Sequence, residues 1–230
     1  MPASPGRSRE SRPASLQSSG VSPGLGSAWP SVLPHITLGC VKCNFDASYH
    51  GIPSWDIGRP QPAFAELAEA RAFCGRVLDV GCGTGEHALL AAAMGLPAAG
   101  VDVSPTAIEI ATRKAAQRNL PVRFTVHDAR NLGTLGEQFD TVIDSALFHV
   151  FSGEDRVRYV EGLHQMVKPG GRYFMLCFSA PRTSPPGVTR QEIEAAFVHG
   201  WRIDEIESAT VAVWTKPFSF PAWRTAMTRI

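Results

Sequence analysis

Apolar runs and amphipathic patterns alternate along the chain from about residue 61. Five apolar runs have the length of strands, and they span residues 75–81, 97–103, 121–128, 139–148 and 172–179. The patterns beside them predict helices at residues 61–73, 86–95, 104–119, 154–167 and 189–200. Because strands that alternate with helices are typical of a parallel sheet, the pattern predicts an α/β fold.

Proline, glycine and serine mark several of the predicted helix boundaries. Pro62 lies in the first turn of its helix, where the missing N–H costs little. Gly95 is placed to end the second predicted helix. Ser104 followed by Pro105 is a helix start with a side-chain cap and a proline at the first helical position.

The C-terminal third of the chain is harder to assign. The sequence KPGG at residues 168–171 predicts a turn before the fifth strand. Residues 201–214 contain two more strand candidates, which we expect to form a hairpin at the sheet edge. Residues 220–230 follow soon afterwards, so the completion of the last strand stays open.

The N-terminal residues differ in composition from the rest. Residues 1–40 are rich in Ser, Pro, Gly and Arg, with Glu10 as their only acid, and we expect them to be disordered. A downstream start codon or a targeting segment are the alternatives. Residues 41–60 form a predicted cap segment with aromatic side chains, and residues 61–230 form the predicted catalytic domain.

Composition narrows the class of protein. A chain of 230 residues with 44% hydrophobic content can form one domain of about 200 residues and an appendage. The net charge of +1 shows no general bias toward nucleic acid or an anionic membrane, and no apolar run approaches the ~20 residues of a membrane span. Five cysteines are too few and too scattered for a disulfide framework, which favours a reducing cytoplasm.

The strongest motif is VLDVGCGTGEHALL at residues 77–90, in which three glycines separate a strand from a helix. Gly81, Gly83 and Gly85 stand at alternate positions. A dinucleotide loop needs a glycine where Glu86 stands, and a carboxylate there is a poor neighbour for a diphosphate. Since no G-K-[ST] follows, the loop favours a nucleoside without phosphates.

Acidic residues end three of the predicted strands. Asp79, Asp102 and Asp128 are expected at one edge of the sheet, where open α/β folds bind ligands. Asp102 can accept hydrogen bonds from ribose hydroxyls, although dinucleotide folds use the same device. Asp128 can accept from an adenine amine while Ala129 offers its backbone N–H. A cationic sulfonium cofactor suits such an edge.

The motifs VLDVGCGTG, VDVSPTAI, HDARNL, FDTVIDSALFH and VKPGGRYFML together resemble those of class I S-adenosylmethionine-dependent methyltransferases. The resemblance covers about residues 61–208. It implies a Rossmann-like, seven-stranded, mostly parallel sheet with helices on both faces and an antiparallel last strand. It implies S-adenosyl-L-methionine as cofactor, with the glycines near its methionine portion, Asp102 near the ribose, Asp128 near the adenine, and Asp79 orienting the loop. Val103 and Ser145 complete the predicted cofactor set.

A finer resemblance concerns FDASYHGIPSWDIGRPQPAF at residues 45–64. This stretch is similar to the entry segment of thiopurine and thiocyanate S-methyltransferases and of bacterial enzymes that methylate quinolone-like heterocycles. The resemblance implies that Tyr49 and Trp55 close over the cofactor, with cation–π attraction to the sulfonium. Trp55 is therefore included among the predicted cofactor-binding residues.

His149 is the candidate catalytic residue, because it follows the fourth strand, where such enzymes hold the acceptor. A base is needed only when the acceptor atom arrives protonated. The alternative is a packed histidine or one bonded to Asp144. We expect no metal site, since Cys40 and Cys43 have no second ligand pair.

Several other residues have a structural interpretation that we favour. We expect a surface or packing role for His87, a packing role for Cys82 and a core position for Cys177. Charged residues on the helix at 104–119 are interpreted as a solvated face, and they are Arg113, Lys114 and Arg118. The aromatic residues that fit either the acceptor pocket or the core are Phe148, Phe151, Trp201 and Trp214.

The sequence therefore predicts a cytoplasmic methyltransferase that acts on a small, apolar or aromatic acceptor at sulfur, nitrogen or oxygen. We expect no nucleic-acid or membrane partner, and the oligomeric state is unreadable. The alternatives are an NAD(P)-dependent oxidoreductase, for which no Tyr-x-x-x-Lys set is found, and a non-catalytic protein that binds S-adenosylmethionine.

Overall fold

The computed structural model describes residues 41–179, 187–216 and 218–230, with side chains from Phe45 onward. The predicted leader and Cys40 lie outside this part of the chain. The helices are α1 Val41–Ser48, α2 Pro62–Glu69, α3 Glu86–Ala93, α4 Pro105–Gln117, α5 Gly153–Met166 and α6 Arg190–Ala196, with 3₁₀ helices η1 Ala129–Leu135 and η2 Phe148–Val150. The strands are β1 Val77–Val80, β2 Ala98–Asp102, β3 Val122–Val126, β4 Phe139–Ser145, β5 Val167–Phe178, β6 Trp201–Ala212 and β7 Ser219–Arg229.

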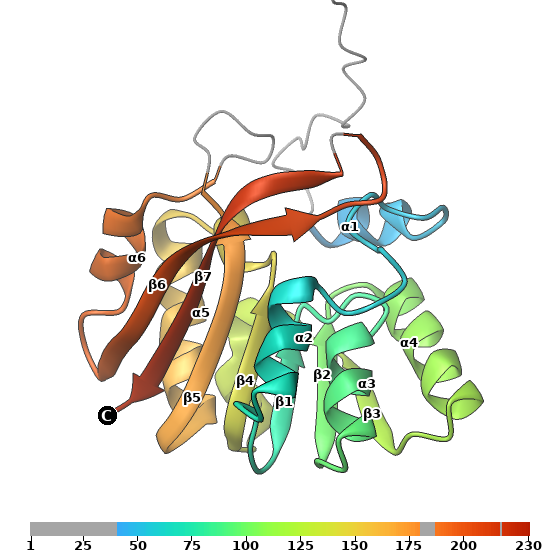
Figure 1. Ribbon diagram of the computed structural model, residues 1–230, viewed down its shortest axis with the longest axis horizontal. Helices are drawn as coiled ribbons and strands as arrows, with labels where there is room; N and C mark the ends of the chain where they lie inside the picture. The colour runs from blue at the N-terminus through green and yellow to red at the C-terminus, as the bar shows by residue number, and fades with distance from the viewer. Residues whose placement is uncertain (1–40, 180–186, 217) are drawn as a thin grey trace, which may run out of the picture. The chain divides into compact units, whose positions relative to one another are not determined.

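The described strands form one seven-stranded sheet in the order β3-β2-β1-β4-β5-β7-β6 (Figure 1). Neighbouring strands from β3 to β5 pair in parallel, whereas β7 pairs antiparallel with both β5 and β6. The predicted fold, an α/β sheet with an antiparallel last strand, is confirmed. Its strand order reverses between β1 and β4, so the carboxyl ends of these strands offer a ligand crevice.

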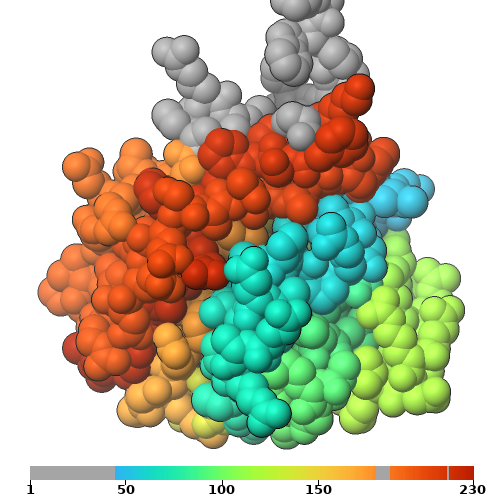
Figure 2. Space-filling view, viewed as in Figure 1, coloured from blue at the N-terminus to red at the C-terminus, as the bar shows by residue number. Residues whose placement is uncertain are grey.

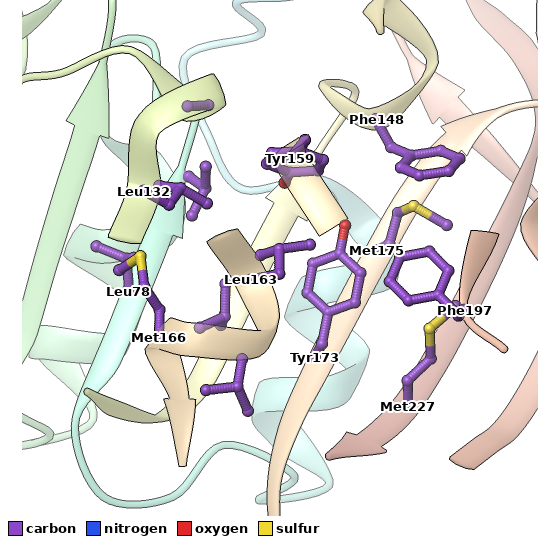
Figure 3. Close-up of a cluster of buried hydrophobic side chains, with 14 of the residues drawn as sticks. Leu78, Leu132, Phe148, Tyr159, Leu163, Met166, Tyr173, Met175, Phe197 and Met227 are labelled. Atoms are coloured by element: carbon purple, nitrogen blue, oxygen red, sulfur yellow. The ribbon is translucent and has the colours of Figure 1, made fainter. Parts of the chain in front are cut away.

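Helices cover both faces of the sheet because successive side chains of each strand point to opposite sides. Tyr173 and Met175 of β5 join an apolar cluster with α5, α6 and η1, as Figure 3 shows. Phe174 and Leu176, between and after them, join a second cluster with α2 and α3. Each face therefore has its own buried core, and the site lies along the edge between them.

Local signals in the sequence set the helix ends as predicted. The Ser104 hydroxyl accepts a hydrogen bond from the Ala107 N–H, and Pro105 takes the first position of α4. Gly95 follows α3 with a φ of +82°, which a residue with a side chain adopts only under strain. Thr189 and Glu192 form a capping box at the start of α6.

Two predictions for the C-terminal third are wrong. The KPGG stretch lies within β5 rather than before it, in a register irregularity opposite Phe139 and Thr141. Residues 201–212 form one long strand instead of a hairpin, and the partner is β7 from the C-terminal residues. β6 and β7 together form a hairpin that the sequence did not predict, with β6 at the sheet edge and β7 paired with β5.

Among the described residues, no helix has both the length and the apolar content needed to cross a membrane.

Candidate functional site

The glycine loop joins β1 to α3, and its backbone adopts positive φ angles that residues with a side chain rarely adopt. Gly81, Gly83 and Gly85 have φ values of +66°, +50° and +89°. A Cβ on Gly81 would lie 2.9 Å from Leu147, and one on Gly83 would lie 2.8 Å from the Tyr49 hydroxyl. The loop is therefore closely enclosed.

Asp102 ends β2 and ties the glycine loop to the start of α4. One carboxylate oxygen accepts from the Gly83 N–H and the other from the Ser104 N–H, each at 2.9 Å. Asp102 is buried. Each oxygen keeps a lone pair, so the carboxylate can accept further hydrogen bonds from a diol.

Asp79 on β1 is fully buried beneath the loop. Its Oδ2 accepts from the Ala88 N–H at 3.2 Å, whereas Oδ1 has no partner among the described residues. Burial raises the pKa of Asp79 to about 8. Beside it, burial lowers the pKa of His87 to about 4, and His87 Nε2 accepts from the Gln61 N–H. Of the two roles expected for His87, a surface position or packing, the structure shows packing, since the side chain is buried.

The raised pKa of Asp79 predicts a pH dependence of stability. The folded state keeps this carboxyl protonated below pH 8, whereas the unfolded chain ionises it near pH 4. Stability is thus present at low pH and lost as pH rises through 8, by about 1–2 kcal/mol between pH 6.5 and 8.5. We expect urea unfolding of the ligand-free protein to show this decline, and Asp79→Asn to remove it.

Asp140→Asn is the matched control for this experiment. Hydrogen bonding to Lys168 lowers the pKa of Asp140, so its charge is constant over the same pH range. The control should retain the decline in the free energy of unfolding. An equal decline in Asp79→Asn would contradict the assignment to this carboxyl.

A cavity of ≈ 590 Å³ opens beside the ends of β2 and β3. It is lined by Asp46, Val103, Pro105, Val126, His127, Asp128, Asn131 and Thr134. Asp128 receives two side-chain hydrogen bonds from Arg130, at 3.0 and 2.7 Å, which also raise the pKa of that guanidinium. Ala129 is buried next to it. The structure thus brings Val103 and Asp128 together in a pocket next to Asp102.

The cap segment, residues 41–60, lies against the glycine loop. The Tyr49 hydroxyl lies over Gly83 and accepts from Trp55 Nε1 at 3.3 Å, with the two rings edge to face. The Thr84 hydroxyl donates to Asp56 at 2.9 Å. Figure 2 shows the blue and cyan cap between the green atoms of α3 and α4 and the red end of the β6–β7 hairpin.

Three further anchors, formed by the cap and by the residue that follows it, were not predicted. The Gln61 side chain bonds both backbone groups of Ala212, and Trp214 Nε1 donates to the Pro53 carbonyl at 2.8 Å. Asp46 on α1 contacts the start of α4. Polar residues in a loop-like segment gave no periodic signal, so only the three-dimensional contacts reveal them.

His149 lies in η2, the short helix that follows β4. It is 6% exposed, its ring lies 4.4 Å from that of Phe178, and Nδ1 has no hydrogen-bond partner among the described residues. Burial, with a smaller effect of Arg156, lowers its pKa to about 4. The imidazole is therefore neutral at physiological pH and has a free nitrogen.

Asp144 holds the turn that carries His149, rather than bonding His149 itself. Its carboxylate accepts from the N–H groups of Leu147 and Phe148 and from the hydroxyls of Tyr159 and Tyr173, at 2.7–3.3 Å. Burial raises its pKa to about 6. Ser145, which follows it, is half-buried at the end of β4.

The remaining candidates have structural roles, with one correction. Phe148, Phe151 and Trp201 belong to the core, as do Cys82 and Cys177, whereas Trp214 is half exposed. Lys114 and Arg118 are not merely a solvated face, because both bind Glu86 at 2.8–2.9 Å. Within the described ranges, no group of three His, Cys, Asp or Glu side chains could hold a metal ion.

The arrangement suits a cationic nucleoside. Buried acids line the strand ends. The carboxylate of Glu86 beside the loop is already paired with the side chains of Lys114 and Arg118. The unpartnered Oδ1 of Asp79 and the enclosed glycines fit an amino-acid portion, whereas the cavity beside Asp128 fits a base. The residues thus fit S-adenosylmethionine, the cofactor that the sequence implied.

Comparison with known proteins agrees with this site. The family model described as a methyltransferase domain matches residues 77–171. The 2-heptyl-1-hydroxyquinolin-4(1H)-one methyltransferase of Mycobacteroides abscessus is 36% identical over 179 residues, which cover 72% of this chain and 79% of that protein. Probable thiol methyltransferase 2 of Arabidopsis thaliana is 30% identical over 148 residues, or 59% of this chain and 62% of that protein.

A solved structure has the same fold at similar identity. Its description concerns the conversion of a disulfide bond into a thioacetal group during echinomycin biosynthesis. It aligns with a TM-score of 0.74 at 36% identity, over 80% of this chain and 91% of that chain.

Proposed function

This chain belongs to the class I S-adenosylmethionine-dependent methyltransferases, and we propose that its acceptor is a small, apolar or aromatic molecule. The observation that carries the proposal is the aromatic wall beside His149, where the Phe178 ring lies 4.4 Å from the imidazole at a tilt of 34° and the Phe220 ring lies 5.6 Å from that of Phe178. Such walls bind flat, weakly polar molecules. The nicotinamide-dependent alternative is not favoured, because the matched proteins are methyltransferases.

The cofactor is proposed to lie along the strand ends. When bound, S-adenosylmethionine supplies a methyl group activated by a sulfonium. Asp102 would hold the ribose hydroxyls and the cavity beside Val103 and Asp128 the adenine. Gly81 and Gly83 would approach the methionine portion, with Asp79 beneath them. Trp55 and Ser145 would border the reacting centre from the cap and from β4.

Methyl transfer is an in-line displacement, so the protein mainly positions the acceptor and excludes water. His149 would accept the proton of an acceptor that arrives protonated, since it is neutral and Nδ1 is free. Because a histidine with so low a pKa is a weak base, it can remove the proton only from acceptors that become more acidic as the bond to the methyl group forms. The names of the two relatives are consistent with this scheme. The Mycobacteroides abscessus protein is named for a hydroxyquinolone acceptor and the Arabidopsis thaliana protein for a thiol acceptor.

The proposed function is tested by incubating the purified full-length protein with S-adenosylmethionine and a panel of aryl thiols, N-hydroxyquinolones and polar amines. We expect S-adenosylhomocysteine to form with the first two classes and the product to gain one methyl group. Turnover with the polar amines alone would overturn the acceptor class. Binding of S-adenosylhomocysteine without any turnover would favour the non-catalytic alternative.

The role of His149 predicts a dependence on the acceptor. We expect His149→Ala to lower kcat roughly 100-fold for an acceptor that is protonated at the assay pH, and little for an ionised thiol. The wild-type rate should not fall through a histidine titration between pH 8 and 6, since the pKa lies near 4. The exposed His199→Ala is the control. Equal kcat losses for both acceptors would contradict a base role.

A cytoplasmic location is also part of this proposal. It is supported by the free thiols of Cys74, Cys82 and Cys177. Fractionation of cells that express the full chain would test it, and enrichment outside the cytoplasm would overturn it.

A further inference from the structure

Asp46 on α1 places a carboxylate at the start of α4. Its Oδ1 accepts from the Ser104 hydroxyl at 2.6 Å and from the Thr106 N–H at 3.0 Å. The first turn of a helix presents free N–H groups and a partial positive charge, and it therefore attracts anions. In this protein the anion at the start of the 13-residue α4 is supplied by the chain itself.

The same carboxylate lines the cavity that Val103 and Asp128 line. Asp102 is its neighbour on this turn, because the Ser104 N–H donates to Asp102 while the Ser104 hydroxyl donates to Asp46. Two acidic side chains thus share one helix start at the edge of the cavity. One of them, Asp46, comes from the cap.

This position decides which nucleosides fit. In related α/β folds an acid after the second strand binds the ribose 2′-hydroxyl, and a basic residue is needed to accommodate a 2′-phosphate. Here a phosphate on the ribose would meet Asp46, and the helix start that could bind it is occupied. Arg130 does not compensate, because Asp128 and Asp155 already bind its guanidinium.

We propose that Asp46 is a positioning and specificity-determining residue: it holds α1 over the adenosine cavity and excludes nucleosides phosphorylated on the ribose. The inference rests on the proposed function, since it takes Asp102 as the ribose-binding residue. The two hydrogen bonds supply the positioning, and the negative charge supplies the discrimination. These contributions can be separated by substitution.

The experiment is isothermal titration of the full chain and three variants with S-adenosylhomocysteine, followed by competition with adenosine and adenosine 2′-monophosphate. Asp46→Asn keeps an acceptor oxygen without the charge, and Asp46→Ala removes both. Glu109→Gln, an exposed acid on α4, is the control. We expect Asp46→Ala to weaken S-adenosylhomocysteine binding about tenfold and Asp46→Asn about threefold, with no change in the control.

The discrimination ratio is the readout that a merely structural role would not move. We expect the preference for adenosine over adenosine 2′-monophosphate to fall about tenfold in both Asp46 variants. Unchanged S-adenosylhomocysteine affinity in Asp46→Ala, or an unchanged ratio in Asp46→Asn, would overturn the proposal. If Asp46→Ala does not fold, the preference of Asp46→Asn for adenosine over adenosine 2′-monophosphate tests the proposal alone. A wild-type protein that does not bind S-adenosylhomocysteine would instead overturn the proposed function, and this inference with it.

Discussion

Replacing Asp102 with alanine is expected to weaken S-adenosylhomocysteine binding by about 100-fold or more. A hydrogen bond to a charged group contributes roughly 1.5–3 kcal/mol, and the carboxylate would form two with the ribose. The substitution also leaves the Gly83 and Ser104 N–H groups without their acceptor. The glycine loop would therefore lose its tie to α4 as well as its ligand contacts.

Isothermal titration of the full chain measures this effect. Asp102→Asn keeps one acceptor oxygen and is expected to lose about tenfold, so that the two variants form a graded series. Glu194→Ala on α6 removes an exposed acid far along the chain and should bind like the wild type. Thermal unfolding checks that each variant is folded. An Asp102→Ala affinity within threefold of the wild type would show that the ribose is bound elsewhere.

The sequence predicted best where a local rule acts alone. The start of α4 depends only on Ser104 and Pro105, and the strands β1, β2 and β4 are short apolar runs between glycine or proline signals. These features need no partner to be recognised. Asp79 and Asp102 were found in the same way, because the ends of parallel strands must meet at one edge.

The sequence failed where long-range pairing decides. Residues 201–212 contain enough polar residues for a break, yet they remain one strand because β7 pairs with them from Trp201 to Ala212, with one irregularity between Ile203 and Glu205. The KPGG stretch has turn residues and is itself unpaired, but Val167 and Arg172 on its two sides pair with Phe139 and Thr141 of β4, so the stretch lies within one strand. In both cases tertiary pairing overrides local propensity.

Much of the site is also held by contacts between distant residues. Asp46 and Thr106 are 60 positions apart, and Gln61 and Ala212 are 151 apart. Glu86 illustrates a partial success: its carboxylate was recognised as unsuited to a diphosphate, but its cations on α4 were interpreted as solvated. The sequence around one charged residue does not indicate which distant residue will form an ion pair with it.

The second large effect concerns the third glycine of the loop, where alanine is expected to lower the free energy of unfolding by about 3–4 kcal/mol. Gly85 has a φ of +89°, and an added Cβ would lie 2.6 Å from Phe124 on β3 and 3.0 Å from Ala111 on α4. A positive φ costs roughly 1–2 kcal/mol for a residue with a side chain, and overpacking adds about 1–3 kcal/mol.

Gly95→Ala is the matched control, because Gly95 has a φ of +82° but nothing within 4 Å of the added Cβ. Urea unfolding should give a loss of about 1–2 kcal/mol for this variant, from backbone strain alone. Equal losses at the two positions would show that crowding at Gly85 is relieved without cost.

A double-mutant cycle identifies the neighbour responsible. If the Phe124 ring causes the clash, then Phe124→Leu should recover part of the loss in the Gly85→Ala background, although it is destabilising alone. Additive losses would place the strain elsewhere. Recovery would mean that Gly85 is required for the packing of β3 and α4 against the loop, whereas Gly81 and Gly83 approach Leu147 and Tyr49 at the edge where the cofactor is proposed to bind.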